Sequence, residues 1–462
     1  MTTSKKNILK SRDDKTPLFF EEITEEKPTS QKFKLANSDS TCSWITSNQE
    51  FGSEVLRPRI EPWLTALFQS EHLSLLLGSG LTHAVHQIAT DTSLPGMNAV
   101  TFTHYSNEIE KAAKISAEKS GRDTGNIEDQ IRTASELIRG LEITGDEKYK
   151  YIQKDLKTIL ESFSKSILKG ESDLISSDSS KRETAFNYLV SFLMSFASRT
   201  GTRDRLQIFT TNYDRYIETG ADLAGLHLLD RFVGVLSPIF RSSRLDIDIH
   251  YNPPGIRGEP RYLEGVAKFT KLHGSVDWIN TRQNIRRIGV PFGAEKIDPY
   301  LKTPGLIEDD VLQLMVYPNA AKDRETSAYP YVELFRDFAS ATCRPNSTLI
   351  SYGYSFGDEH INRVIEDMLT IPSTHLVIIS YDDPLERIMR TYERLGRHAQ
   401  ITLLIGPHLG DFQTLVDCYL PKPAIDKTTF RMAELLKSRW GTESMEQDKS
   451  TPNSDSQEVS FL

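Results

Sequence analysis

Residues 73–80, LSLLLGSG, decide the class of fold, because an apolar run ends there in Gly78-Ser79-Gly80. Such a run bounded by glycine is typical of a buried strand, and residues 81–88 then place apolar side chains at helical spacing. A glycine turn between a strand and a helix can hold a diphosphate, because small residues let the backbone approach and the helix presents free N–H groups to the anion. The stretch also fits a tight turn without a ligand, since the third glycine of the dinucleotide fingerprint is missing.

Further short apolar runs predict the rest of a sheet. They lie at residues 206–210, 269–272, 348–352, 376–380 and 401–405. Segments with helical spacing separate several of them, for example residues 361–368. Short apolar strands that alternate with helices indicate a parallel sheet covered on both faces. We therefore predict an α/β fold with a Rossmann-like parallel sheet flanked by helices.

The chain divides into three parts by composition. Residues 1–53 are polar and lack periodicity, which predicts a flexible N-terminal arm. Residues 54–420 form the predicted α/β domain, and their segment from about 105 to 200 carries three apolar stripes that indicate a large helical insertion. Residues 421–462 are predicted to be a C-terminal helix and a polar tail.

The amino-acid composition excludes several classes of function. The chain has 462 residues, 38% of them apolar, and a net charge of -9, so a protein-wide attraction to nucleic acid is not expected. An N-terminal apolar signal and a membrane-length apolar run are both missing, so we expect a cytoplasmic protein without membrane contact. The three cysteines, Cys42, Cys343 and Cys418, lie far apart, which argues against a disulfide framework or a thiolate metal site.

A polar motif, TTNYD at residues 210–214, follows the predicted strand 206–210. Ligands of open α/β sheets bind at the carboxyl ends of the strands. Asn212 can donate and accept hydrogen bonds, as a ribose hydroxyl or a positioned water requires. The alternative is structural, because Asn and Asp also cap the N-termini of helices.

Three further side chains follow strands in the same way. His273 comes after strand 269–272 and can take a proton from a hydroxyl or water, although a lone histidine is more often structural. The motif GYSFGD at residues 353–358 turns sharply after strand 348–352, and its Ser355 can bond a phosphate or ribose. Asp382 follows strand 376–380 and is a candidate partner of an adenosine ribose, or else part of a turn.

Taken together, these motifs resemble the sirtuin family over about residues 62 to 410, interrupted by the helical insertion. The resemblance implies that Gly78, Ser79 and Gly80 hold the diphosphate of NAD, with Thr82 at the position of the family's loop serine. It implies that Asn212 and Asp214 meet the nicotinamide ribose, and that the adjacent Thr211 also binds NAD. In the same order along the chain, His273 would carry the base, and Gly353 and Ser355 would hold the adenosine half.

The departures from the family pattern are informative. Deacylating sirtuins carry a zinc module of four cysteines, which this chain cannot build. The stretch after Gly80, LTHAVH, lacks the family's Gly-Ile-Pro and Phe-Arg continuation. The amino-acid sequences of the motifs instead resemble those of the zinc-free branch found in bacterial anti-phage defence. That resemblance implies hydrolysis of NAD to nicotinamide and ADP-ribose, without a metal.

In this hypothesis Asn212 positions a water and His273 takes its proton, directly or through a ribose hydroxyl. The resemblance also implies control of a toxic hydrolase, by a HerA-like ring ATPase as partner or by homo-oligomerisation. Two other classes of function stay open. One is an NAD-dependent protein deacylase or ADP-ribosyltransferase, which needs an acceptor groove. The other is a non-catalytic sensor of NAD or ADP-ribose, against which the presence of both Asn212 and His273 counts.

Overall fold

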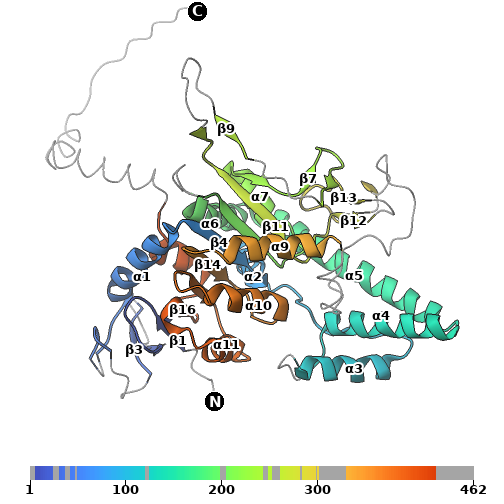
Figure 1. The fold of residues 1–462 in the computed structure, drawn as a ribbon, viewed down its shortest axis with the longest axis horizontal. Coiled ribbons are helices and arrows are strands. Elements are labelled where there is room, and N and C mark those ends of the chain that lie inside the picture. Colours follow the sequence, from blue (N-terminus) through green and yellow to red (C-terminus); the bar gives the residue numbers. More distant parts are fainter. Residues whose placement is uncertain are drawn as a thin grey trace, which may run out of the picture. The chain divides into compact units, whose positions relative to one another are not determined.

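The computed structural model describes residues 6–23, 31–36, 42–46, 49–119, 124–197, 204–242, 248–251, 261–280, 284–297, 299–300 and 329–422. In this part of the chain a ten-stranded sheet has the order β3-β2-β1-β16-β15-β14-β4-β5-β11-β6 (Figure 1). Its strands are β1 (Asn7–Lys10), β2 (Leu18–Glu22), β3 (Phe33–Leu35), β4 (His72–Leu77), β5 (Leu206–Thr210), β6 (His227–Leu229), β11 (Val266–Lys271), β14 (Ser347–Tyr352), β15 (His375–Ser380) and β16 (Ile401–Ile405).

The predicted parallel sheet is confirmed. The six predicted runs are β4, β5, β11, β14, β15 and β16, and they pair with one another in parallel. In the register of the sheet, Leu77 lies beside both Tyr352 and Thr210, and Thr210 lies beside Lys271. The four segments that follow these residues therefore leave the sheet at one edge, which is where ligands of such sheets bind.

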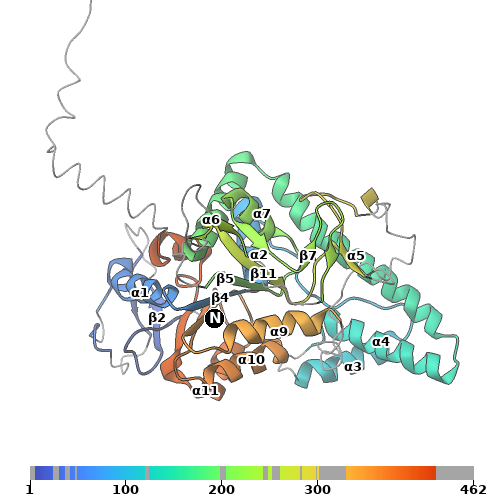
Figure 2. The ribbon, with the colours of Figure 1, turned by 45° about the horizontal axis from the view of Figure 1, so that its top comes forward.

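Helices cover both faces of the sheet (Figures 1 and 2). One face packs against α1 (Ser53–Phe68), α2 (Ser79–Thr90), α6 (Ser179–Ala197) and α7 (Tyr216–Ala224). The other packs against α9 (Tyr331–Thr342), α10 (Glu359–Leu369) and α11 (Arg387–Leu395). Side chains of β4 alternate between the two cores, with Leu75 and Leu77 in the first and Leu76 in the second, as the period of a strand requires.

The helical insertion is formed by α3 (Ser106–Lys119), α4 (Ile127–Thr144), α5 (Tyr149–Ile175) and α6. The first three pack side by side around their own apolar cluster (Figures 1 and 2). Asn126 starts α4 with a capping box, in which its side chain accepts from Asp129 N and the Asp129 side chain accepts from the Asn126 backbone. Tyr213 and Val276, which flank the predicted site, belong to the same apolar cluster, so the insertion is joined to that site.

The remaining described elements are short. A four-stranded sheet has the order β12-β13-β8-β7, with β7 (Phe232–Val233), β8 (Ile239–Phe240), β12 (Trp278–Asn280) and β13 (Ile285–Arg287). Also present are a pair of β9 (His250–Tyr251) and β10 (Arg261–Tyr262), and η3 (His398–Gln400), α12 (Phe412–Thr414) and η4 (Leu415–Tyr419). Among the described residues, no helix combines the length and the apolar composition that crossing a membrane requires.

The described strands of the N-terminal segment belong to the ten-stranded sheet. The sequence predicts a flexible arm for residues 1–53, but β1 of this segment pairs antiparallel with β16, and β2 and β3 extend the sheet from there. Phe20 and Phe33 are buried in the main core. These strands have three to five residues each and are separated by polar stretches, so no periodicity marks them. From residue 423 onward, the predicted C-terminal helix and tail lie outside the described residues.

Because two histidines are buried, we expect the folded protein to lose stability in acid. Burial, with a contribution from the charge of Lys10, lowers the pKa of His375 to about 4, and burial lowers that of His408 to about 4. The Thr402 hydroxyl oxygen lies 2.8 Å from His375 Nε2 and also accepts from Trp63 Nε1 at 3.0 Å. Between pH 6.5 and 4 the unfolded chain binds protons that the folded chain does not, so stability falls as the pH falls.

We expect each histidine to lower the free energy of unfolding by about 2 kcal/mol between pH 6.5 and 4. Urea unfolding at several pH values measures this loss. His375→Gln keeps an acceptor beside Thr402 but cannot titrate, so its stability should depend less steeply on pH. An unchanged slope in His375→Gln would show that His375 is not the group that titrates.

Candidate functional site

The loops that leave the aligned strand ends surround a cavity of about 1160 Å³. Nine of the eleven residues that the sequence predicts for the site line it. They are Gly78, Ser79, Thr82, Thr211, Asn212, Asp214, His273, Gly353 and Ser355. Sites for small molecules usually measure about 300–1,000 Å³, so this cavity has room for a ligand as large as a dinucleotide.

The two glycine turns are packed directly against each other. Gly80 N–H donates to Gly353 O at 3.1 Å, and Gly78 N–H donates to Tyr352 O at 3.0 Å. A Cβ on Gly80 would lie 2.6 Å from Gly353 Cα, and Gly353 has a φ of +61°, so neither position accommodates a side chain. Gly80 is not among the described residues that line the cavity. Instead, the hydrogen bond from its backbone N–H and its lack of a side chain allow the two turns to pack together.

The amide of Asn212 is held in one orientation. Its Nδ2 donates to Gly78 O at 2.9 Å and to Thr82 Oγ1 at 3.0 Å, and Thr82 Oγ1 in turn donates to Asp214 Oδ2 at 2.7 Å. Only 6% of Asn212 is exposed. Both Nδ2 hydrogens are therefore used, whereas Oδ1 accepts no hydrogen bond from the described residues. This oxygen is left to accept a hydrogen bond from a ligand or a water in the cavity.

His273 is paired with a carboxylate that the sequence reasoning missed. Its Nε2 lies 2.8 Å from Asp358 Oδ2, and the two side chains are 13% and 5% exposed. Asp358 Oδ1 accepts from His360 N at 3.0 Å and so caps the start of α10. A carboxylate only accepts, so it holds the proton on Nε2 and leaves Nδ1 as the basic nitrogen. The signal for this partner was present, because Asp358 ends a motif at the same sheet edge.

This geometry predicts the effect of Asp358→Asn. The new amide can still cap α10 through its oxygen, but its NH₂ group then faces Nε2 and favours the tautomer with the proton on Nδ1. Because that tautomer cannot act as a base, kcat for any reaction that needs His273 as base should fall about 10²-fold or more, with KM little changed. Steady-state kinetics measures this effect. The control is Asp367→Asn, an exposed change on α10 that should leave kcat intact.

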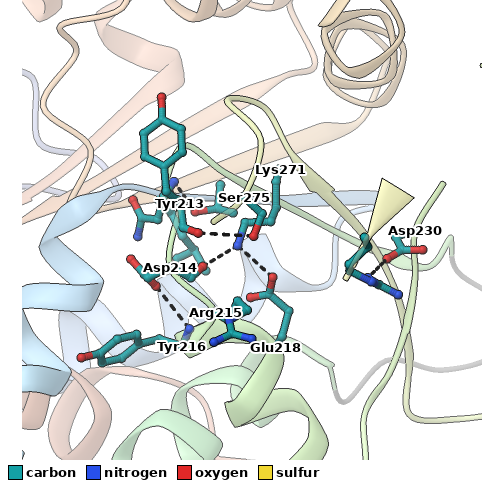
Figure 3. Close-up of polar contacts among 12 residues, drawn as sticks. Tyr213, Asp214, Arg215, Tyr216, Glu218, Asp230, Lys271 and Ser275 are labelled. Atoms are coloured by element: carbon teal, nitrogen blue, oxygen red, sulfur yellow. Dashed lines mark hydrogen bonds and ion pairs between the residues drawn. The ribbon is translucent and has the colours of Figure 1, made fainter. Parts of the chain in front are cut away.

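The buried ammonium group of Lys271 contacts Asp214 and Glu218 (Figure 3) and so joins the segment after β5 to the end of β11. Lys271 is 2% exposed, its Nζ donates to the Asp214 carbonyl oxygen, and it pairs with Glu218 Oε1 at 2.8 Å. Backbone contacts add to this link, because Val276 N donates to Tyr213 O at 2.9 Å. Lys271 stands two residues before His273, so the link sets the spacing between the two predicted catalytic residues.

A second buried ion pair connects the site to the helical insertion. Glu171 of α5 is fully buried, and its Oε1 accepts from Arg215 N at 2.9 Å and from Nε at 3.2 Å. Its Oε2 lies 2.5 Å from Arg215 Nη2. Burial alone would lower the pKa of Arg215, but the Glu171 charge and hydrogen bonds raise it above its usual value. Arg215 directly follows Asp214, so α5 fixes the backbone next to the Asn212 network.

The insertion also forms a wall of the cavity, which periodicity alone could not show. Asp129 and Arg132 of α4 and Phe163 of α5 line it, together with His83 of α2 and Arg387 of α11. Burial lowers the pKa of His83, opposed by the charge of Asp214. Within the described part of the chain, no group of three or more His, Cys, Asp or Glu side chains is arranged to hold a metal ion.

Asp382 does not join the other predicted site residues. It is exposed and is not among the described residues that line the cavity. Its backbone carbonyl accepts from Ser380 Oγ at 2.8 Å, and the neighbouring Asp383 carboxylate accepts from the backbone N of Ile388 and Met389 at 3.1 and 3.0 Å. These bonds belong to a turn and a helix start, which is the alternative that the sequence left open.

The fold and the cavity define an α/β protein with a dinucleotide-sized site at the carboxyl edge of a parallel sheet. Residues 206–399 match the model of the family described as SIR2-like domain. No curated protein matches the chain. The match supports a sirtuin-like family and covers Asn212, His273 and the 353–358 turn, whereas the Gly78 turn lies before it. SIR2-like domains are usually NAD-dependent enzymes, so the match implies the use of NAD.

Proposed function

We propose that this protein hydrolyses NAD to nicotinamide and ADP-ribose. The main support is that one cavity contains both Asn212, whose Oδ1 accepts no hydrogen bond from the described residues, and the His273–Asp358 pair. Activation of a water requires an acceptor oxygen that is held in place. It also requires a base with one free nitrogen, here Nδ1, whose proton is fixed on the other nitrogen, Nε2. A deacylase or an ADP-ribosyltransferase needs an acceptor groove for a protein. A non-catalytic sensor needs no base.

The proposed reaction breaks one bond and forms one. The C–N bond between nicotinamide and the ribose breaks, and its electron pair leaves with nicotinamide. Asn212 Oδ1 accepts a hydrogen bond from the attacking water, which turns a lone pair of the water toward the electron-poor ribose carbon. As the new C–O bond forms, His273 Nδ1 takes the proton, directly or through a ribose hydroxyl, and later releases it to solvent. The Asp358 carboxylate stabilises the imidazolium that forms in between.

The test is product analysis with the full-length chain, NAD and ¹⁸O-labelled water. Hydrolysis predicts equal amounts of nicotinamide and ADP-ribose, with the label on the ribose. Asn212→Ala/His273→Ala serves as the blank. Nicotinamide without free ADP-ribose, when candidate proteins are added, would favour a deacylase or an ADP-ribosyltransferase. Bound NAD that stays intact in every condition would favour a sensor and would overturn the proposal.

We also propose that the activity serves anti-phage defence through depletion of NAD, and that it is held in check. Control would come from a HerA-like ring ATPase or from assembly of several copies of this chain, and the resemblance of the motifs is the support for both. Size-exclusion chromatography with activity assays, with and without the ATPase, tests this point. Full activity in a purified monomer would contradict control of either kind.

A further inference from the structure

The cavity is rich in carboxylates and poor in cations. Among the described residues that line it there is no lysine, and the guanidinium groups are those of Arg132 and Arg387. The acidic residues of its lining are Glu128, Asp129, Glu136, Asp214, Asp358 and Glu359. A dinucleotide carries two negative charges on its diphosphate, so a cation at the right place would favour its binding beside these carboxylates.

Arg132 and Arg387 differ in their positions. Arg132 belongs to the insertion wall, where its Nη2 lies 3.5 Å from Asp129 Oδ1. Arg387 lies against the second glycine turn instead. A Cβ built on Gly357 would be 2.7 Å from Arg387 Nη1 and 3.4 Å from Ser355 Oγ. The guanidinium group therefore rests on the bare backbone of Gly357, close to the Ser355 hydroxyl.

The place of Arg387 in its helix does not explain its presence. It is the first residue of α11, where the positive end of the helix dipole disfavours a cation. The carboxylate of Asp383 already accepts from backbone N–H groups of the first turn. The residue before it, Glu386, has a φ of 51°, which is unusual for a residue with a side chain. Local preferences therefore do not account for this residue, as is expected at functional or strained positions.

We infer that Arg387 binds the diphosphate of NAD, together with Ser355 and the backbone of the 353–357 turn. This inference rests on the proposed function and adds the residue that selects phosphorylated ligands. The glycine at 357 is what admits a planar guanidinium group against the turn, where it can offer two N–H donors to phosphate oxygens. The helix after the first glycine turn, residues 79–90, contains no lysine or arginine that could take this role.

The experiment measures binding of ADP-ribose, ADP and adenosine to the full-length chain by calorimetry. Arg387→Ala should weaken binding of ADP-ribose and of ADP by about 10- to 100-fold, because the charged contact to phosphate is lost. Its affinity for adenosine should not change. Arg387→Lys keeps the charge but not the fork of donors, so it should fall in between. Arg390→Ala is the matched control, since Arg390 is exposed one turn further along α11 and pairs with Glu386.

The possible results separate the two proposals. If wild-type protein binds ADP-ribose and Arg387→Ala binds it equally well, Arg387 does not bind the diphosphate, and NAD hydrolysis is unaffected as a proposal. If wild-type protein binds neither ADP-ribose nor ADP, both proposals fail. If Arg387→Ala weakens ADP-ribose and adenosine alike, the residue supports the shape of the turn and does not contact phosphate. Thermal unfolding of every variant, with Arg387→Gln as a second neutral change, excludes a loss of folding.

Discussion

Asn212→Ala is expected to lower kcat for release of nicotinamide from NAD by about 10³-fold, with a smaller change in KM. Alanine lacks Oδ1, the amide oxygen that accepts no hydrogen bond from the described residues. It also removes the donors that hold Gly78 O and Thr82 Oγ1. Water in the cavity then loses its orientation at the ribose carbon, and Asp214 loses part of the network that positions it.

Two further variants make the Asn212 result specific. Asn212→Asp keeps the shape but replaces Nδ2 by an acceptor beside Gly78 O, so we expect a loss nearly as large as for alanine. Asn187→Ala, an exposed change on α6, should leave kcat unchanged. Chromatography of nicotinamide over time measures all three, and thermal unfolding shows that each is folded. A fall of less than about tenfold for both Asn212 variants would remove this residue from the mechanism.

Glu171→Ala has the second-largest expected effect, and the effect is on stability. Removing this carboxylate leaves Arg215, which is 6% exposed, as an uncompensated charge inside the protein. Breaking a buried ion pair from one side costs about 3–5 kcal/mol. We expect urea unfolding to show a loss of this size. Asp173→Ala is the control on the same helix, because Asp173 pairs with Lys169 at the surface and its loss should cost well under 1 kcal/mol.

A double variant separates stability from the positioning of the site. Glu171→Ala/Arg215→Met removes both charges, so it should recover most of the lost stability. It should not recover activity, because the carboxylate no longer anchors the Arg215 backbone next to Asp214. Recovery of both properties together would show that the pair serves only the fold. Recovery of stability alone would show that α5 positions the site.

Much of the fold could be predicted from local pattern. Buried strands such as residues 73–77 and 376–380 are almost entirely apolar because both faces of a parallel sheet are covered, and this leaves a clear signal. The glycines at 78, 80 and 353 mark the turns. The strands β1 to β3 could not be found in this way, because each buries only a few side chains within a polar segment. Their place is decided by pairing with β16, which is distant in sequence.

In the candidate site, too, local sequence marks some features and distant contacts decide others. Asn212, His273 and the glycine turns carry their chemistry in residue type and in their position after a strand, so the sequence marks them. Asp382 has the same local signature, yet it lies outside the cavity lining, because the turn after β15 is built from Ser380 and Asp383. Local pattern cannot distinguish a side chain that faces a ligand from one that ends a strand.

The sequence by itself determined the parallel sheet, the edge at which its polar motifs meet and the residue types available there, because strand period and glycine turns are local properties. The tertiary structure alone decided which groups act together. The pairing of His273 with Asp358, the anchoring of Arg215 by Glu171 and the contact of Arg387 with Gly357 join residues 30 or more positions apart. Such contacts depend on the register of the sheet and on how the insertion packs against it, and neither property is encoded in any short stretch of the chain.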